Sequence, residues 1–148
     1  MSCIQRMDER ADAVFTALQA DAALSQRVLK RSLRRHITDH ETADLKKGVV
    51  MLVCKGEGGY AAGTPNYIAM DGAQDFFIVG HLIDDDDQGP EVIEQMEMDL
   101  AEEIKAFMRT IVNGMTFNLL RIAISAQADY PYGMVLAEFQ ALPPDDNI

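Results

Sequence analysis

The sequence predicts a single α/β (α+β) domain, with a mixed β-sheet of about four to six strands and a long hairpin, flanked by two main helices. Three observations predict this fold. The chain has 148 residues, a length that suits one domain. Apolar residues recur at helical spacing in two separate segments, and short apolar or alternating runs typical of strands follow each of them. We expect the domain to span residues 1–142 and to be followed by a flexible tail, 143–148.

The first third of the chain begins with a helix, expected over residues 6–23, where apolar residues share one face and acidic residues lie in the first turns. Segment 26–37, QRVLKRSLRRHI, fits both a period of two and an i, i+4 stripe. We favour a strand there, and a helix stays the alternative. Segment 38–47, TDHETADLKK, is expected to be a polar connection.

The centre of the chain predicts a long hairpin. Segments 48–54 and 74–83 are strands with apolar residues on both faces, and the glycine-rich segment 55–66 forms the loop or hairpin tip between them. This loop lacks the GxxxxGK[ST] order and no helix follows it at once, which excludes a phosphate-binding P-loop.

The last third predicts a second amphipathic helix over residues 90–112, which Asn113-Gly114 ends as a left-handed cap. A closing hairpin of two strands, 117–125 and 134–142, follows.

Composition excludes several function classes. The net charge is −11, and it is unevenly divided, because residues 1–60 hold ten Lys/Arg and eight Asp/Glu while residues 61–148 hold three and sixteen. This charge disfavours non-specific nucleic-acid binding, and no apolar run approaches the ~20 residues of a membrane span. The start of the chain is polar, unlike a secretory signal peptide. Cys3 and Cys54 read as reduced thiols in a cytoplasmic setting.

The aspartate run Asp84–Asp87 has two interpretations. Pro90 suits the first turn of a helix, and acidic residues before it favour the positive end of the helix dipole, so we expect the run to start the helix. A calcium loop is the weaker alternative, because position 12 would be Gln95 and position 7 would be Pro90.

The histidines do not predict an active site. His36 and His40 have metal-like spacing only if their segment is helical, and in a polar connection we expect both to be solvated. His81 lies in a mostly apolar strand and is expected to be a core or interface residue. We therefore expect no catalytic residue, no metal and no cofactor. The alternative from another class is a small metal-dependent enzyme that uses these histidines and Asp84–Asp87.

A basic cluster in segment 26–37 is the local charge feature to which we assign an interaction, either with acidic residues of a neighbouring subunit or with DNA that passes by; a solvated strand face is the alternative. It consists of Lys30, Arg31, Arg34 and Arg35.

The strands of the long hairpin predict a partner chain. Both are apolar on two faces, and two helices cover one face of such a sheet, so something else has to cover the second face. We expect another copy of the chain to do so.

The order and local texture of residues 6–142 resemble the tail terminator proteins of long-tailed bacteriophages, the family of the lambda minor tail protein U. The resemblance rests on a helix before an Arg-bearing strand, the apolar strand VVMLVCKGEGG, its return strand DFFIVGHLIDDDD, the helix EVIEQMEMDLAEEIKAFM and the closing hairpin LLRIAIS…MVLAEFQAL.

This resemblance implies a structural virion protein without catalytic residues, whose subunits form a ring, expected to have six copies, at the head-proximal end of the tail. Such a ring caps the tail tube protein, stops its polymerisation and receives the head-completion or neck protein, while DNA passes through the lumen without specific binding. The subunits are expected in the host cytoplasm during assembly, with no membrane. Another neck, tail-completion or tube protein, or a monomeric or dimeric adaptor, stays an alternative.

Overall fold

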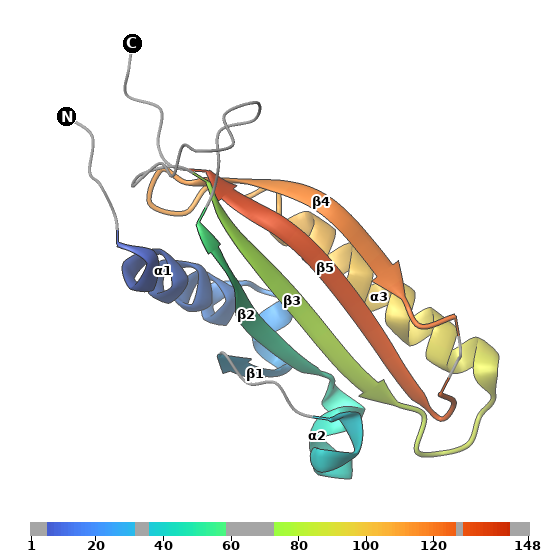
Figure 1. Ribbon diagram of the computed structural model, residues 1–148. Helices are drawn as coiled ribbons and strands as arrows, with labels where there is room; N and C mark the ends of the chain where they lie inside the picture. The colour runs from blue at the N-terminus through green and yellow to red at the C-terminus, as the bar shows by residue number, and fades with distance from the viewer. Residues whose placement is uncertain (1–5, 32–35, 59–72, 127–128, 143–148) are drawn as a thin grey trace.

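A five-stranded mixed sheet organises the computed structural model, which describes residues 6–31, 36–58, 73–126 and 129–142 (Figure 1). The strands are β1 (Val28–Arg31), β2 (Val49–Gly58), β3 (Gln74–Ile83), β4 (Thr116–Ile124) and β5 (Tyr132–Leu142). Their order across the sheet is β1-β2-β3-β5-β4. Strands β1 and β2 are parallel, and the other neighbouring pairs are antiparallel. The predicted fold class, a mixed sheet flanked by helices, is confirmed.

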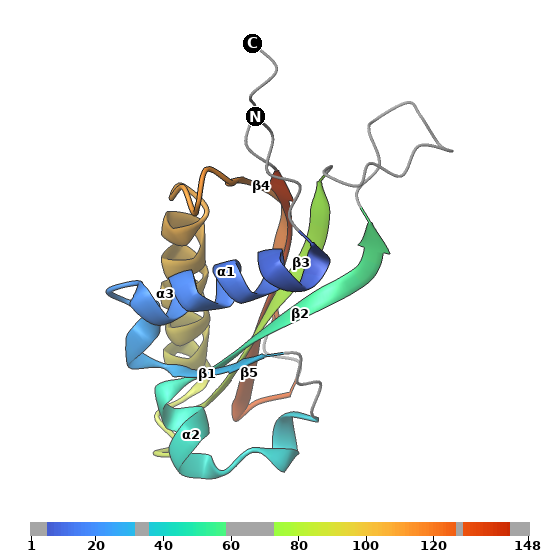
Figure 2. The same ribbon diagram turned by 90° about the vertical axis from the view of Figure 1, so that its left-hand side faces the viewer.

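Two long helices, α1 (Met7–Ala20) and α3 (Pro90–Phe107), lie on one face of this sheet, which we call the helix face (Figure 2). Alternate residues of β3, among them Phe76 and Ile78, pack there against α3 in the main core. Gly80 allows the closest approach, because a Cβ atom at this position would lie 2.4 Å from Cδ2 of Leu100. The amphipathic pattern of both helices thus finds its apolar partner on one sheet face.

The end of α3 corrects one prediction. Pro90 begins the helix as expected, but the helix stops at Phe107, before the predicted end at residue 112. Asn113 and Gly114 have φ angles of 51° and 82° and form the turn between Val112 and Met115, whose backbone groups exchange hydrogen bonds of 2.9 and 2.8 Å. Two consecutive residues with positive φ are typical of a tight hairpin turn, so Asn-Gly here starts β4 instead of capping a helix.

The segment before β2 corrects a second prediction. The expected polar connection 38–47 contains a short helix, α2 (Thr42–Lys47), whose Leu45 is buried against the other sheet face. This second face carries Val49 and Met51 of β2, which pack with Leu45 in a smaller cluster. The expectation that the chain has no element to cover this face is therefore wrong for the part over β2 and β3.

Segment 26–37 is shorter as a strand than predicted. Its described residues form β1 over Val28–Arg31, between a 3-10 turn at Leu24–Gln26 and another at Ile37–Asp39. Residues 32–35 lie outside the described part of the chain. Where the sequence left strand and helix open, residues 28–31 are a strand.

Candidate functional site

The predicted basic cluster is divided by the pleat of β1. Lys30 is in register with Met51 and so belongs to the second face. Arg31, the next residue, belongs to the helix face and forms an ion pair with Asp12 of α1. Arg34 and Arg35 lie outside the described residues. Only Lys30 and Arg31 can therefore be placed, and they point to opposite sides of the sheet.

Two of the three histidines meet on the second face. Nε2 of His40 and Nδ1 of His81 share a hydrogen bond of 3.0 Å, and both side chains are buried. Burial, together with the nearby imidazoles of His40 and His36, lowers the pKa of His81 to about 4, so this imidazole is neutral at pH 7. His81 was expected in a core or interface and is buried; the expectation that His40 is solvated is wrong.

The histidine pair links α2 to the sheet. His40 lies just before α2, and His81 belongs to β3, so their hydrogen bond fastens the covering segment to the strand beneath it. His36 has a different, local role, because its Nδ1 accepts the N–H of Thr38 and lies 2.9 Å from its Oγ1. Within the described residues no group of three or more His, Cys, Asp or Glu side chains has the geometry to hold a metal ion.

The aspartate run organises a loop. Asp84 is buried, and its Oδ2 accepts hydrogen bonds from the hydroxyl of Tyr130 at 2.7 Å and from the N–H of Gly89 at 2.9 Å. The bond to Asp84 is the main reason why the pKa of Tyr130 rises to about 12. Burial acts to raise the pKa of Asp84, but these hydrogen bonds outweigh it and the pKa is lowered.

The expected cap is therefore only partly present. Glu91 lies in the first turn of α3 as predicted, but Gly89, the residue at the N-cap, has no side chain to accept a hydrogen bond. Asp85 forms an exposed contact of 3.6 Å with Lys46. Asp84 joins the β3–α3 loop to the loop before β5, and Oδ1 of Asp87 also lies within hydrogen-bond distance of the Tyr130 hydroxyl, at 2.9 Å.

Glu97 is a buried charged residue that the sequence reasoning missed. It lies in the apolar stripe of α3, and its Oε2 accepts the N–H of Met134 at 2.7 Å, the N–H of Ser125 at 3.3 Å and the Ser125 hydroxyl. Ile124 and Val135 are the last residues that pair between β4 and β5, and the two N–H groups belong to the residues next to them. The Glu97 carboxylate therefore accepts backbone hydrogen bonds at the point where the pairing of these two strands ends. The position of Glu97 was the signal that could have revealed it, because this residue falls at helical spacing between the apolar residues Ile93 and Leu100 of the buried stripe.

The second face changes from covered to open along one row of paired residues. The row runs through Met51 of β2, Val79 of β3, Leu136 of β5 and Ala123 of β4. Met51 is 1% exposed, Val79 and Leu136 are half-buried, and Ala123 is exposed. We call the part over β1, β2 and β3 the covered half and the part over β5 and β4 the open half.

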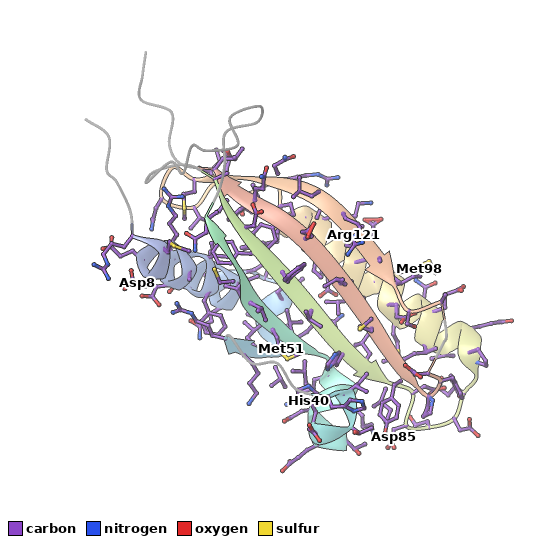
Figure 3. The ribbon with its side chains drawn as sticks, viewed as in Figure 1. Asp8, His40, Met51, Asp85, Met98 and Arg121 are labelled. Carbon is purple, nitrogen blue, oxygen red and sulfur yellow. The ribbon has the colours of Figure 1, made fainter. Side chains whose placement is uncertain are left out.

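Exposed apolar side chains gather around β4. Leu120 and Ile124 of β4 are 46% and 37% exposed, and Met134 of the neighbouring β5 is 39% exposed. Together with Ala123 we call them the β4 surface. Figure 3 labels Arg121 of β4 and, on α3 close to the end of this strand, Met98, which is 41% exposed. Strand β4 is also an edge of the sheet, so one side of its backbone has no strand partner among the described residues.

A hollow of about 300 Å³ lies where the two halves meet. Its walls combine His36, His81, Asp129 and Ser125 with the apolar side chains of Ile37, Tyr132 and Met134. Met134 lines the hollow and also belongs to the open half, so the hollow adjoins the open half. It gives that surface a polar margin beside its apolar centre.

No protein-family model matches the chain, and no curated protein matches it. In the described part of the chain, no helix has both the length and the apolar character needed to span a membrane. The candidate site is therefore defined by its geometry alone: an α+β domain with an apolar surface around an edge strand.

Proposed function

We propose that this chain is a structural subunit that forms a ring at the head-proximal end of a bacteriophage tail. The ring, of six copies, caps the tail tube, ends its polymerisation and provides the surface on which the head-completion or neck protein attaches. The subunit acts by contact surfaces and carries no catalytic residue or cofactor in this role. Subunits gather in the host cytoplasm and end in the virion.

The observation that carries this proposal is the open half of the sheet. Apolar side chains exposed together around an edge strand are typical of a surface that another protein covers. Leu120 and Met134 supply such a surface, and neither takes part in the covered half. Ile124 extends the exposed apolar area to the other side of the edge strand, because it is in register with Val135 of the main core. A protein whose work is assembly needs a surface of this kind.

A second argument supports a tail terminator in particular. The order of helices and strands along the chain resembles that family. The chain has a helix before a short basic strand, then a long hairpin, a long amphipathic helix and a closing hairpin. The resemblance implies a mixed sheet flanked by helices, and this is the architecture of the domain. The excess of acidic residues fits a lumen through which DNA moves without specific binding, since it offers little attraction to phosphates.

Electron microscopy of virions that contain this chain tests the proposal. We expect a closed ring of the chain between the tail tube and the neck, and tails of uncontrolled length when the chain is removed. Copies along the whole tube would make the chain a tube protein, and a single copy in the neck would make it another completion protein. Absence from purified virions would refute a structural role.

A further inference from the structure

We propose that the segment over the covered half detaches from the sheet as a unit when the histidine pair beneath it takes up protons, while the rest of the domain stays folded. This segment, residues 36–47, runs from the 3-10 turn through His40 to the end of α2, and we call it the cover. The inference goes beyond the proposed ring and does not depend on it. It follows from how the cover is attached, from the chemistry of two facing imidazoles and from the hollow beside them.

The cover has a small apolar attachment to the sheet. Leu45 is the buried residue of α2, and Ile37 packs partly buried against the same cluster from the 3-10 turn. A segment with few buried apolar contacts detaches at a lower cost in free energy than global unfolding. By contrast, α3 buries five residues along its length: Ile93, Glu97, Leu100, Ile104 and Phe107.

Backbone hydrogen bonds hold the C-terminal end of the cover. The carbonyl of Lys47 accepts a bond from Nη1 of Arg27, and the carbonyl of Gly48 accepts the N–H of Val28, each at 2.9 Å. Gly48 has a φ angle of 92° and joins the cover to β2. This end can therefore stay in place as a hinge, while the bond of His40 lies toward the end that moves.

The two imidazoles can bond to each other only in some protonation states. Nε2 of His40 lies 3.0 Å from Nδ1 of His81, so one nitrogen donates its hydrogen and the other accepts it. A first added proton leaves this bond intact but puts a positive charge in a buried site. A second proton places N–H groups on both facing nitrogens, so the bond is lost and two like charges oppose each other. Detachment hydrates both rings and removes these costs.

The surroundings of His81 favour its neutral form. Its partners in register are Val49 of β2 and Met134 of β5, and both are uncharged. Burial, and then the imidazoles of His40 and His36, keep the pKa of His81 at about 4. Protonation is therefore easier once the cover has left the sheet.

The charged groups around the pair lie mostly in solvent. Asp129 lines the hollow together with His81 and half-buried Tyr132, but its own side chain is exposed. Figure 3 labels His40 beside α2 and Asp85 on the loop after β3, where Asp85 contacts Lys46 of the cover at 3.6 Å. The other charged residues of the cover are Asp39, Glu41, Asp44 and Lys47, of which Asp44 is half-buried and the rest are exposed.

The hollow gives protons a route to the pair in the folded domain. The His81 ring lines it, and the exposed residues His36 and Asp129 share its wall, so water reaches the ring from this side. The pair can therefore respond to pH without unfolding of the sheet.

Hydrogen exchange of the full chain, followed by nuclear magnetic resonance, tests the detachment. The probes are the N–H groups of Leu45 and Gly48, which bond to the carbonyls of Glu41 and Asp44. A helix as short as α2 is not stable alone in water, so these bonds break when the cover leaves the sheet. The amides that pair β3 with β5 are the internal reference.

We expect the two cover amides to exchange faster than the reference amides at both pH 7 and pH 5. After correction for the intrinsic exchange rate at each pH, their detachment equilibrium constant should rise about twentyfold from pH 7 to pH 5. The rise has this size because the detached His81 ring regains its ordinary pKa of 6.5, whereas the attached ring has a pKa of about 4.

Three substitutions locate the proton. His81→Gln removes the ring with the lowered pKa, so the rise should fall well below the wild-type value. His40→Gln removes the other ring and should reduce the rise as well, which keeps the test open if one variant does not fold. Asp85→Asn is the matched control, because it removes the acidic partner of Lys46, and it should keep the full rise.

Three results would overturn the inference. A detachment constant that is the same at pH 7 and pH 5 would show that the pair does not control the cover. Equal protection of the cover and reference amides at both pH values would show that the cover leaves only on global unfolding. A rise that is lost in Asp85→Asn and kept in His81→Gln would place the response in the contact between Lys46 and Asp85.

Discussion

The two halves of the second sheet face belong to one sheet and show the same alternation of residues, yet only one half is covered by its own chain. Over β2 and β3, Leu45 of α2 and the hydrogen bond between His40 and His81 close the surface. Over β5 and β4, Met134 and Leu120 stay exposed. Apolar residues on a strand therefore do not by themselves show whether the chain or a partner covers them.

The difference between the two halves depends on which strands the short helix α2 can reach. Helix α2 has only six residues, and it precedes β2 directly, so it can reach β2 and β3 but not the far side of the sheet. Among the described residues, no helix lies over β4 and β5 on this face (Figure 2). Proteins that expose apolar residues together usually bury them against another molecule.

The largest effect is expected from Leu45→Ala. Leu45 is 2% exposed, and its loss leaves a cavity over Met51, so the free energy of unfolding should fall by about 3 kcal/mol. Urea unfolding followed by circular dichroism measures this change. Leu120→Ala is the matched control and should change the same quantity by less than about 0.5 kcal/mol. Equal losses in the two variants would contradict the division into a covered and an open half.

Acidification should weaken the covered half. His81 has a folded pKa of about 4, below its ordinary value of 6.5, so the unfolded chain binds the proton more readily. Stability from this group is complete above pH 6.5 and is lost as the pH falls toward 4, with about 2 kcal/mol gone between pH 7 and pH 5. Unfolding curves at both pH values measure the loss.

Replacing the His81 imidazole tests this pH effect, because its protonation is the cause of the slope of stability between pH 7 and pH 5. His81→Gln should make the slope shallower. A nuclear magnetic resonance titration of the His81 ring is the direct check, and a value near 6.5 would show that the ring is not held neutral.

A smaller effect is expected from Asp84→Asn. The change removes the charge that accepts bonds from Tyr130 and Gly89, so the unfolding midpoint should fall measurably, by less than in Leu45→Ala. Asp85→Asn is the matched control, since Asp85 has only an exposed contact with Lys46, and it should be nearly neutral. If Asp84→Asn and Asp85→Asn changed the unfolding midpoint equally, the hydrogen bonds of Asp84 to Tyr130 and Gly89 would not contribute to stability.

The smallest effect on the monomer is expected from Leu120→Ser combined with Ile124→Ser. Both side chains are exposed, so each change should alter the free energy of unfolding by about 0.5 kcal/mol or less. The same variant should lose self-association in analytical ultracentrifugation, because the β4 surface becomes polar. Unchanged association would remove this surface from the proposed interface.

Much of the fold could be predicted because several segments carry a long and regular pattern. Strand β3 has the predicted bounds, Gln74–Ile83, and α3 begins at Pro90 as its first-turn signal indicates. Short segments were less predictable. Helix α2 has one buried apolar residue, Leu45, which is too few to show a period, and Asn113-Gly114 suits either a helix cap or a hairpin turn.

By itself the sequence determined the long helices and strands and which of their faces are apolar, because the periods of 3.6 and 2 residues are local properties of the chain. Only the tertiary structure decided what meets those faces. It brings His40 to His81, Tyr130 to Asp84, and Glu97 to the backbone of Met134. Each pair is far apart in the sequence, and its members meet only when packing brings their elements together.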